Sequence, residues 1–294
     1  MRVFVLGGSG SIGGPVVREL IRAGHEVMAL ARSAASAATV ARIDARPIVG
    51  DMTTPERWIA ALPPLDGVIQ AAAAFGADDE AVELRLLQIL LPHLRAADRS
   101  VRFIYTGGCW LFGESDARTV TTEATPFDPL PAFAWGVAHC RQVLDARGID
   151  PIVIHPAMVY EPCGGVFARF RNDAIGRDAV RVVAGEQVHW PLVHAEDLAA
   201  LYRLALEGSA PGESYIGAAI EGMPVGRIAR AYARRYGTRR TDPEVISADR
   251  IAAELGEWAR GYALHQWQSG EKARRRLGWR PLHLDPVSEI GAIP

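Results

Sequence analysis

The chain has 294 residues, a formal net charge of −2, 49% hydrophobic residues and 22% charged residues. So apolar a chain can build a core, which excludes a disordered protein, and its near-neutral charge argues against nucleic acid as the main ligand. No apolar run approaches the roughly 20 residues of a membrane-spanning helix, and residues 1–10 predict a strand rather than a signal peptide. The cysteines, Cys109, Cys140 and Cys163, follow no metal-ligand or disulfide spacing. We therefore expect a cytoplasmic protein that binds neither nucleic acid nor membrane.

Strand-like and helix-like segments alternate through the first half of the chain. The apolar run 2–6 predicts a buried parallel strand, and apolar residues recur at helical spacing from Ile12 to Ile21, before Gly24. The segment 53–56 (Thr-Thr-Pro-Glu) predicts a capped helix start. Such alternation predicts βαβ units in an α/β fold, a Rossmann-type doubly wound parallel sheet. Further strands are predicted at 26–31, 46–50, 66–73, 101–106 and 151–155, and a helix at about 131–147.

After residue 156 the alternation loosens. The extra segments are expected to build a smaller, mainly helical lobe over the carboxyl edge of the sheet, where ligands bind in open α/β folds. We predict strands near 180–184 and 213–217, and helices at 195–207, 224–236, 248–259 and 270–277. The predicted division is a dinucleotide-binding domain of 1–156 plus about 190–220, and a substrate-binding lobe of about 157–189 plus 221–294.

A glycine-rich turn separates the first predicted strand from the first predicted helix. Gly7, Gly10 and Gly13 form a GxxGxxG pattern, which allows a tight turn and close backbone approach to a pyrophosphate at a helix N-terminus. Because the flanking strand and helix are both predicted, a nucleotide site is favoured over a turn without ligand. The predicted contacts in this loop are Gly7, Ser9, Gly10, Ser11, Ile12 and Gly13.

The end of the second strand indicates which cofactor is bound. An acidic residue there would hold the ribose hydroxyls of NAD, but this chain has Arg32 and Ser33. A guanidinium and a hydroxyl suit the 2′-phosphate of NADP(H), the alternative being that Arg32 is merely solvated. Asp51 and Met52 are assigned to the adenine edge. The remaining predicted cofactor contacts are Ala71, Ala72, Ala73, Thr106, His139, Pro156, Met158 and Val159.

Together, these motifs resemble the extended or atypical branch of the short-chain dehydrogenase/reductase superfamily, which includes the NAD-dependent epimerases and dehydratases. The resemblance runs from Met1 to about Ala219, and 277–281 is similar to the end of such proteins. It implies a dinucleotide-binding fold and oxidoreductase chemistry. The motifs that carry it are the glycine loop, Gly50-Asp51-Met52, Tyr105-Thr106-Gly107-Gly108, 155–160 and 192–199.

The catalytic residues usual in this superfamily are missing. Its members usually carry a Ser or Thr after the fifth strand and YxxxK on the next long helix, where the Tyr transfers the proton and the Lys holds the nicotinamide ribose. The resemblance places Gly108, Trp135 and His139 at these three positions. The sequence has one lysine, Lys272, and Gln268 precedes it by four residues, so no shift of the alignment restores the motif.

Four residues near these positions have open roles. The indole N–H of Trp135 donates a hydrogen bond but is no acid at neutral pH. His139, one turn further along the same face, is either a ligand of the ribose or a proton relay, or else a buried polar residue without chemistry. Thr106 is able to hydrogen-bond a carbonyl group, whereas Cys109 has no activating partner in the sequence and is interpreted as a small buried residue.

Two further groups of residues have a functional and a structural interpretation. His194, Glu196 and Asp197 do not have zinc-ligand spacing, so they are interpreted as a helix start, and no metal is predicted. A second group is aromatic-rich and is either core or the wall of a pocket for a flat, apolar substrate. The residues predicted to bind substrate are Trp110, Trp135, Met158, Tyr160, Phe167, Phe170 and Trp190.

The sequence is compatible with three functions. The first is an NADPH-dependent ketoreductase for an aromatic ketone, with the proton supplied by substrate or water. The missing residues make the chain similar to atypical superfamily members that reduce angucyclinones, which are aromatic polyketides, in antibiotic biosynthesis. The second is a non-catalytic NADP-binding sensor, as in the NmrA-like relatives. The third is a nucleotide-sugar epimerase or dehydratase, whose reaction needs a base at the position of Trp135.

Overall fold

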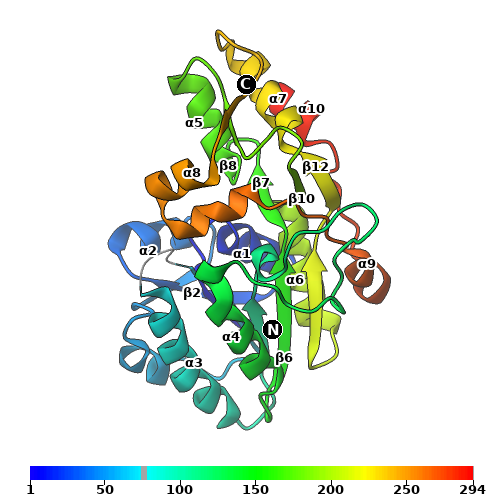
Figure 1. The fold of residues 1–294 in the computed structure, drawn as a ribbon. Coiled ribbons are helices and arrows are strands. Elements are labelled where there is room, and N and C mark those ends of the chain that lie inside the picture. The colour runs from blue at the N-terminus through cyan, green and yellow to red at the C-terminus, as the bar shows by residue number, and fades with distance from the viewer. Residues whose placement is uncertain (74–77, 294) are drawn as a thin grey trace.

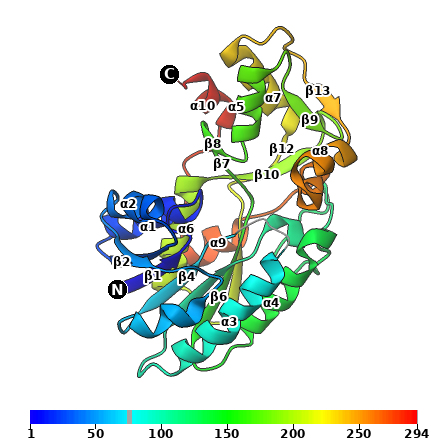
Figure 2. The ribbon, with the colours of Figure 1, turned by 90° about the vertical axis from the view of Figure 1, so that its left-hand side faces the viewer.

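The computed structural model describes residues 1–73 and 78–293, and seven parallel strands within them form the sheet of the larger lobe (Figures 1 and 2). Their order is β11-β6-β5-β4-β1-β2-β3, and each neighbouring pair is parallel. This order confirms the predicted Rossmann-type fold. The strands are β1 (Arg2–Leu6), β2 (Glu26–Ala31), β3 (Arg46–Val49), β4 (Gly67–Gln70), β5 (Arg102–Thr106), β6 (Asp150–Pro156) and β11 (Glu213–Gly217).

Helices cover both faces of this sheet. In Figure 2, α1, α2 and α6 lie on one face, while α3 and α4 lie on the other. The apolar strands are therefore enclosed from both sides, which explains why β1 is a nearly continuous hydrophobic run. The helices are α1 (Gly13–Arg22), α2 (Ala34–Ala41), α3 (Asp79–Arg95), α4 (Ala134–Leu144) and α6 (Ala195–Gly208). Short 3-10 turns lie at Pro55–Arg57, Ile59–Ala61, Cys109–Leu111 and Pro131–Phe133.

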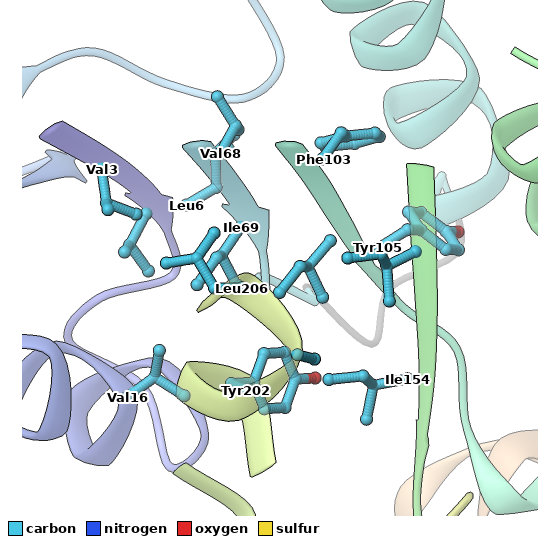
Figure 3. Close-up of a cluster of buried hydrophobic side chains, with 14 of the residues drawn as sticks. Val3, Leu6, Val16, Val68, Ile69, Phe103, Tyr105, Ile154, Tyr202 and Leu206 are labelled. Atoms are coloured by element: carbon cyan, nitrogen blue, oxygen red, sulfur yellow. The ribbon is translucent and has the colours of Figure 1, made fainter. Parts of the chain in front are cut away.

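The side chains of β5 alternate between the two faces of the sheet. Phe103 and Tyr105 point to the face covered by α3 and α4, and Tyr202 of α6 lies on the opposite face (Figure 3). Thr106 also points toward α6, since its hydroxyl lies 2.7 Å from the Tyr202 hydroxyl. The last two residues of β5, Tyr105 and Thr106, therefore lie on opposite faces of the sheet.

The smaller lobe has its own sheets and its own buried cluster. One sheet has the order β12-β10-β7-β8, and β13 pairs with β9 (Figures 1 and 2). The strands are β7 (Met158–Glu161), β8 (Gly164–Gly165), β9 (Arg181–Val183), β10 (His189–His194), β12 (Ile220–Pro224) and β13 (Glu244–Ile246). The helices are α5 (Ala168–Gly176), α7 (Val225–Tyr236), α8 (Ala248–Leu255), the 3-10 helix η5 (Glu257–Ala263) and α10 (Pro286–Gly291). No helix among the described residues is long and apolar enough to span a membrane.

One predicted boundary is wrong. The helix α9 (Glu271–Leu277) and Trp279, which we predicted in the smaller lobe, pack on the core of the larger lobe. Trp279 is 1% exposed, and its indole N–H donates to the carbonyl oxygen of Asp197 over 2.8 Å. The chain therefore returns to the larger lobe before α10 ends in the smaller one.

The predicted helix start at 53–56 is also wrong. The structure has only a 3-10 turn, Pro55–Arg57, without a hydrogen bond from a capping side chain. The hydroxyl and backbone N–H of Thr53 bind the Asp51 carboxylate instead, at 2.9 and 2.8 Å. This local turn competes with helix formation and stabilises the segment that follows β3.

Candidate functional site

The glycine loop has the backbone geometry of an anion-binding turn. Gly7 has a φ of +83°, and a Cβ on Gly13 would lie 2.2 Å from the Gly7 carbonyl oxygen, so both positions need glycine. A Cβ on Gly10 would meet only that carbonyl oxygen, at 3.2 Å. The N-terminus of α1 begins after Ile12 without a side-chain cap. Its first backbone N–H groups thus fit a phosphate group.

The predicted 2′-phosphate residues lie at the end of β2, but only one has a free polar group. Arg32 is exposed, and its charge lowers the pKa of Asp51, although hydrogen bonds from Thr53 are the larger cause. The Ser33 hydroxyl caps α2 by accepting the backbone N–H of Ser36 over 3.1 Å. The structure therefore gives Ser33 a helix-capping role and leaves Arg32 as the stronger phosphate candidate.

We predict that Arg32→Ala weakens NADPH binding and has little effect on NADH binding. The loss of a charge-assisted hydrogen bond to the 2′-phosphate is worth about 1.5–3 kcal/mol. Fluorescence titration of both cofactors measures the difference. Arg42→Ala is the matched control, because Arg42 is an exposed arginine of the next helical segment that contacts Thr39. Equal losses of both cofactors in Arg32→Ala would remove Arg32 from this role.

A cavity of about 40 Å³ lies beside the ends of β3 and β4. It brings together predicted cofactor residues, Met52 with Ala72 and Ala73, and the predicted substrate residue Trp135. Ala71 is outside its wall and donates its backbone N–H to the carbonyl oxygen of Leu6. The cavity wall consists of Met52, Ala72, Ala73, Asp79, Val82, Glu83, Phe133 and Trp135.

Glu83 is the residue of this cavity that the sequence analysis missed. It lies on α3, partly buried, and its carboxylate accepts a hydrogen bond from the Gln70 side chain over 3.1 Å. Burial raises its pKa to about 7, although Gln70 and Tyr105 oppose this effect through hydrogen bonds. A sequence signal did exist. Glu83 stands on the stripe of α3 that continues with the buried residues Leu86, Leu87, Leu90, Leu91 and Leu94.

Of the three predicted positions of the missing catalytic set, Trp135 lines this cavity, and the three positions differ chemically from one another. A Cβ on Gly108 would meet no atom within 4 Å, whereas one on Gly107 would lie 2.4 Å from His155 Nδ1. The indole N–H of Trp135 donates to the carbonyl oxygen of Ala132 over 3.1 Å. His139 is 4% exposed, its Nδ1 has no partner among the described residues, and burial lowers its pKa. The Trp135 and His139 rings are 5.1 Å apart.

Thr106 and Cys109 are held in structural roles. The Thr106 hydroxyl donates to the carbonyl oxygen of Gln70 over 2.5 Å and also contacts Tyr202, so its hydrogen-bonding capacity is satisfied. Burial raises the pKa of the Cys109 thiol to about 12, and its sulfur lies 3.7 Å from that of Met158. A neutral, enclosed thiol is a poor nucleophile, which agrees with the interpretation of Cys109 as a buried residue.

Four residues assigned to the substrate pocket belong to the core of the smaller lobe. Tyr160, Phe167, Phe170 and Trp190 are at most 1% exposed, and Tyr160 stacks on Phe167 with 4.6 Å between ring centroids. Side chains so completely enclosed offer no surface to a ligand. Their assignment to the pocket is therefore wrong, and the structural alternative is correct.

Trp110 and the segment after β6 lie where the two lobes meet. Trp110 packs on the backbone of Gly261 in η5, and its ring is 5.6 Å from that of Phe133, which lines the cavity. Of the cofactor contacts predicted at 156–159, Val159 is partly exposed, while Pro156 and Met158 are buried. Trp135 is thus the predicted substrate residue that reaches the cavity wall.

His194, Glu196 and His283 come close together at the start of α6. Their potential ligand atoms lie within 4.8 Å of one another, and the two imidazole rings stack at 3.8 Å. His194 Nδ1 accepts the backbone N–H of Glu196, so the proton of the neutral ring is on Nε2 and that nitrogen is no metal ligand. Asp197 accepts the backbone N–H groups of Leu282 and His283. These contacts give the cluster a structural role in anchoring the C-terminal segment.

The fold and the glycine loop define a dinucleotide-binding protein of the Rossmann type. A profile of the NAD dependent epimerase/dehydratase family matches residues 3–217, and the chain belongs to this family. It is 27% identical to an uncharacterized protein of Schizosaccharomyces pombe, over 99% of each chain. It is also 27% identical to a 4-hydroxy-2-methyl-3-oxo-4-farnesyl-3,4-dihydroquinoline-1-oxide ketoreductase of Stigmatella aurantiaca, over 99% of this chain and 97% of that protein.

A solved structure with a similar fold is that of a dTDP-glucose 4,6-dehydratase from Streptomyces venezuelae with NAD bound. The TM-score is 0.81 at 19% identity, and the alignment covers 99% of this chain and 95% of that one. At this identity the similarity establishes the fold alone.

Proposed function

We propose that the protein is an NADPH-dependent ketoreductase that works without the Ser-Tyr-Lys set and reduces a ketone of an aromatic polyketide. The observation that carries this proposal is the lining of the cavity beside β3 and β4, to which the aromatic residues Phe133 and Trp135 contribute together with Ala72 and Ala73. Aromatic side chains in this wall suit a flat, apolar substrate, which supports an enzyme that acts on one.

The similarity to a bacterial ketoreductase supports the same reaction. The name of that relative describes a bicyclic substrate with a hydroxyl group on the carbon next to the ketone. A polyketide with a phenol beside its ketone presents a related arrangement. The chain's resemblance to the angucyclinone ketoreductase of the simocyclinone pathway motivates the finer proposal, which is a tailoring step of antibiotic biosynthesis.

The roles of the protein residues follow from their positions. The backbone of the glycine loop and the N-terminus of α1 hold the pyrophosphate, and Arg32 holds the 2′-phosphate. Bound in this way, the cofactor supplies the hydride. Trp135 and Phe133 orient a flat substrate by packing against it. The substrate hydroxyl polarises the ketone and passes its proton to the carbonyl oxygen, because the Trp135 N–H is already donated to Ala132.

The non-catalytic sensor is the second candidate, and the absence of a Tyr and a Lys at positions 135 and 139 favours it. The two candidates differ in turnover. A nucleotide-sugar epimerase or dehydratase is disfavoured because its reaction needs a base where Trp135 stands.

The proposed function is tested by measuring NADPH oxidation with a panel of quinone-type polyketide ketones. Turnover of a member of this panel, with stoichiometric alcohol product, is the expected result. Tight NADPH binding without turnover of any ketone would favour the sensor. Failure to bind either nicotinamide cofactor would contradict both functions.

We predict that Trp135→Phe and His139→Ala each retain at least a tenth of wild-type kcat. Neither side chain has a proton to transfer in the proposed mechanism, and a lost general acid would cost about 10²–10⁴-fold. Steady-state kinetics with saturating NADPH separates an effect on kcat from one on KM. A loss within that larger range in either variant would show that the residue transfers the proton.

A further inference from the structure

Acidic and aromatic side chains both line the cavity beside β3 and β4. Glu83 and Asp79 contribute to it from α3, while Phe133 and Trp135 contribute from the start of α4. Trp135 occupies the position where the superfamily carries its proton-transferring tyrosine, and Glu83 lines the same cavity as Trp135. Of the two acids, Glu83 is the one held by a buried hydrogen-bond partner, Gln70.

The position of the Glu83 carboxyl group is fixed by the end of β4. Gln70 is 1% exposed, and its amide N–H group donates to Glu83 Oε1 over 3.1 Å and to the Ala72 carbonyl oxygen over 3.2 Å. The side-chain oxygen of Gln70, Oε1, in turn accepts the backbone N–H of Ala72 over 3.1 Å. The strand end that lines the cavity thus orients the acid within it.

The groups around Glu83 raise its pKa, so that a large share of this carboxyl group is protonated at neutral pH. Burial is the largest cause of the rise of its pKa to about 7, and Asp79 on the same helix raises it further. The Tyr105 phenol on β5 and the Gln70 amide lower it by hydrogen bonding. Cys140 on α4 also faces this carboxyl group, and burial and Glu83 raise the pKa of its thiol to about 12, so it stays neutral.

We propose that Glu83 is the proton source of the ketone reduction, directly or through one water in the cavity. This inference rests on the proposed function and completes it. Hydride adds to the carbonyl carbon, the π electrons move to the oxygen, and that oxygen takes the proton of the neighbouring substrate hydroxyl. The resulting phenolate takes the proton of Glu83, and the Glu83 carboxylate regains a proton from solvent. The products are the alcohol and the oxidised cofactor.

Other groups near the site are less suited to this role. The Thr106 hydroxyl is engaged by Gln70 and Tyr202, and the pKa of the Cys109 thiol is raised to about 12. Burial lowers the pKa of His139, which leaves its ring neutral at neutral pH. Glu83 combines a transferable proton with a place on the cavity wall.

The variant Glu83→Gln tests the inference, because it keeps an acceptor for Gln70 and removes the proton. We expect wild-type kcat to fall as pH rises through about 7, since the donor must be protonated. At pH 6, the kcat of Glu83→Gln should be about 10²-fold below that of wild type. The kcat of this variant should not fall as pH rises through about 7, so the kcat values of the two enzymes should become similar at about pH 9. Glu80→Gln, which removes an exposed charge from the same helix, should behave as wild type.

A second readout needs neither cofactor nor substrate. In the wild-type protein, the infrared band of a protonated carboxyl group should disappear as pH rises through about 7, and it should be absent from Glu83→Gln. Asp79→Asn should move this titration to lower pH, because removal of a neighbouring negative charge eases ionisation. Turnover with the same pH profile in wild type and Glu83→Gln would overturn the role of Glu83 and leave the reductase proposal standing. Absence of turnover with every ketone would overturn both, even if the infrared titration were observed.

Discussion

Replacing Gly10 by valine is expected to weaken NADPH binding at least about 100-fold while the protein remains folded. A Cβ at this position meets only the Gly7 carbonyl oxygen, at 3.2 Å, so the loop adapts with a small shift. The branched side chain then occupies the space that a phosphate group needs for contact with the backbone, and a 100-fold loss corresponds to about 2.8 kcal/mol. Fluorescence titration with NADPH, together with a thermal melt, measures both parts of the prediction.

Gly13→Val provides the contrasting case. Its Cβ would lie 2.2 Å from the Gly7 carbonyl oxygen, a contact that the backbone cannot relieve without moving β1 away from α1. This variant should lose thermal stability as well as cofactor binding. Normal NADPH binding by Gly10→Val would show that the pyrophosphate is not bound at this loop.

The strands could be predicted because burial on both faces imposes a local pattern. The apolar run 2–6 matches β1, and 26–31 and 213–217 match β2 and β11. The fourth strand was predicted at 66–73, whereas β4 is Gly67–Gln70. Its last residues turn away from the sheet because the Gln70 side chain binds both polar groups of the Ala72 backbone. The hydrophobic pattern of the sequence does not reveal such a side-chain contact, so it does not show where the strand ends.

Long-range contacts explain the elements that sequence patterns misplaced. The assignment of α9 depended on its position in the chain, but its place in the fold depends on Trp279, which contacts Asp197 more than eighty residues earlier. The aromatic residues near β7 and α5 were ambiguous for a similar reason. Tyr160 and Phe167 have the composition of a pocket wall, and only their packing against each other identifies them as core.

The candidate site was predictable where its function depends on backbone geometry. The glycine loop needs particular residues at fixed spacing, and Gly7 and Gly13 have the conformation and close approach that this spacing predicts. Glu83 was missed because its environment is built from β4, β5 and α4. An acid on the apolar stripe of α3 is the only local sign of it, and its meaning depends on Gln70 and Tyr105, which lie 13 and 22 residues away in the sequence.

In the proposed mechanism, the absent tyrosine and lysine make the substrate's own hydroxyl the group on which turnover depends most. Addition of hydride to a ketone creates an alkoxide, which is strongly disfavoured in a dry cavity unless a donor stabilises it. The Trp135 N–H and the Thr106 hydroxyl are both bound to backbone oxygens. Under the proposal, a phenol beside the ketone is hydrogen-bonded to the reacting oxygen before hydride arrives, and Glu83 replaces its proton afterwards.

We therefore expect the enzyme to reduce ketones that carry a neighbouring phenolic hydroxyl and to lose about 10²–10⁴-fold in kcat when that hydroxyl is methylated or absent. The measurement is steady-state reduction of a matched pair of substrates, with binding of each determined separately so that lost affinity is distinguished from lost chemistry. A pair that differs by a methyl group at a remote hydroxyl controls for size. If both members of the first pair are bound and reduced at similar rates, the hydroxyl does not transfer the proton. The carbonyl oxygen must then receive it directly from the protein, and the pH profile of Glu83→Gln would identify the donor.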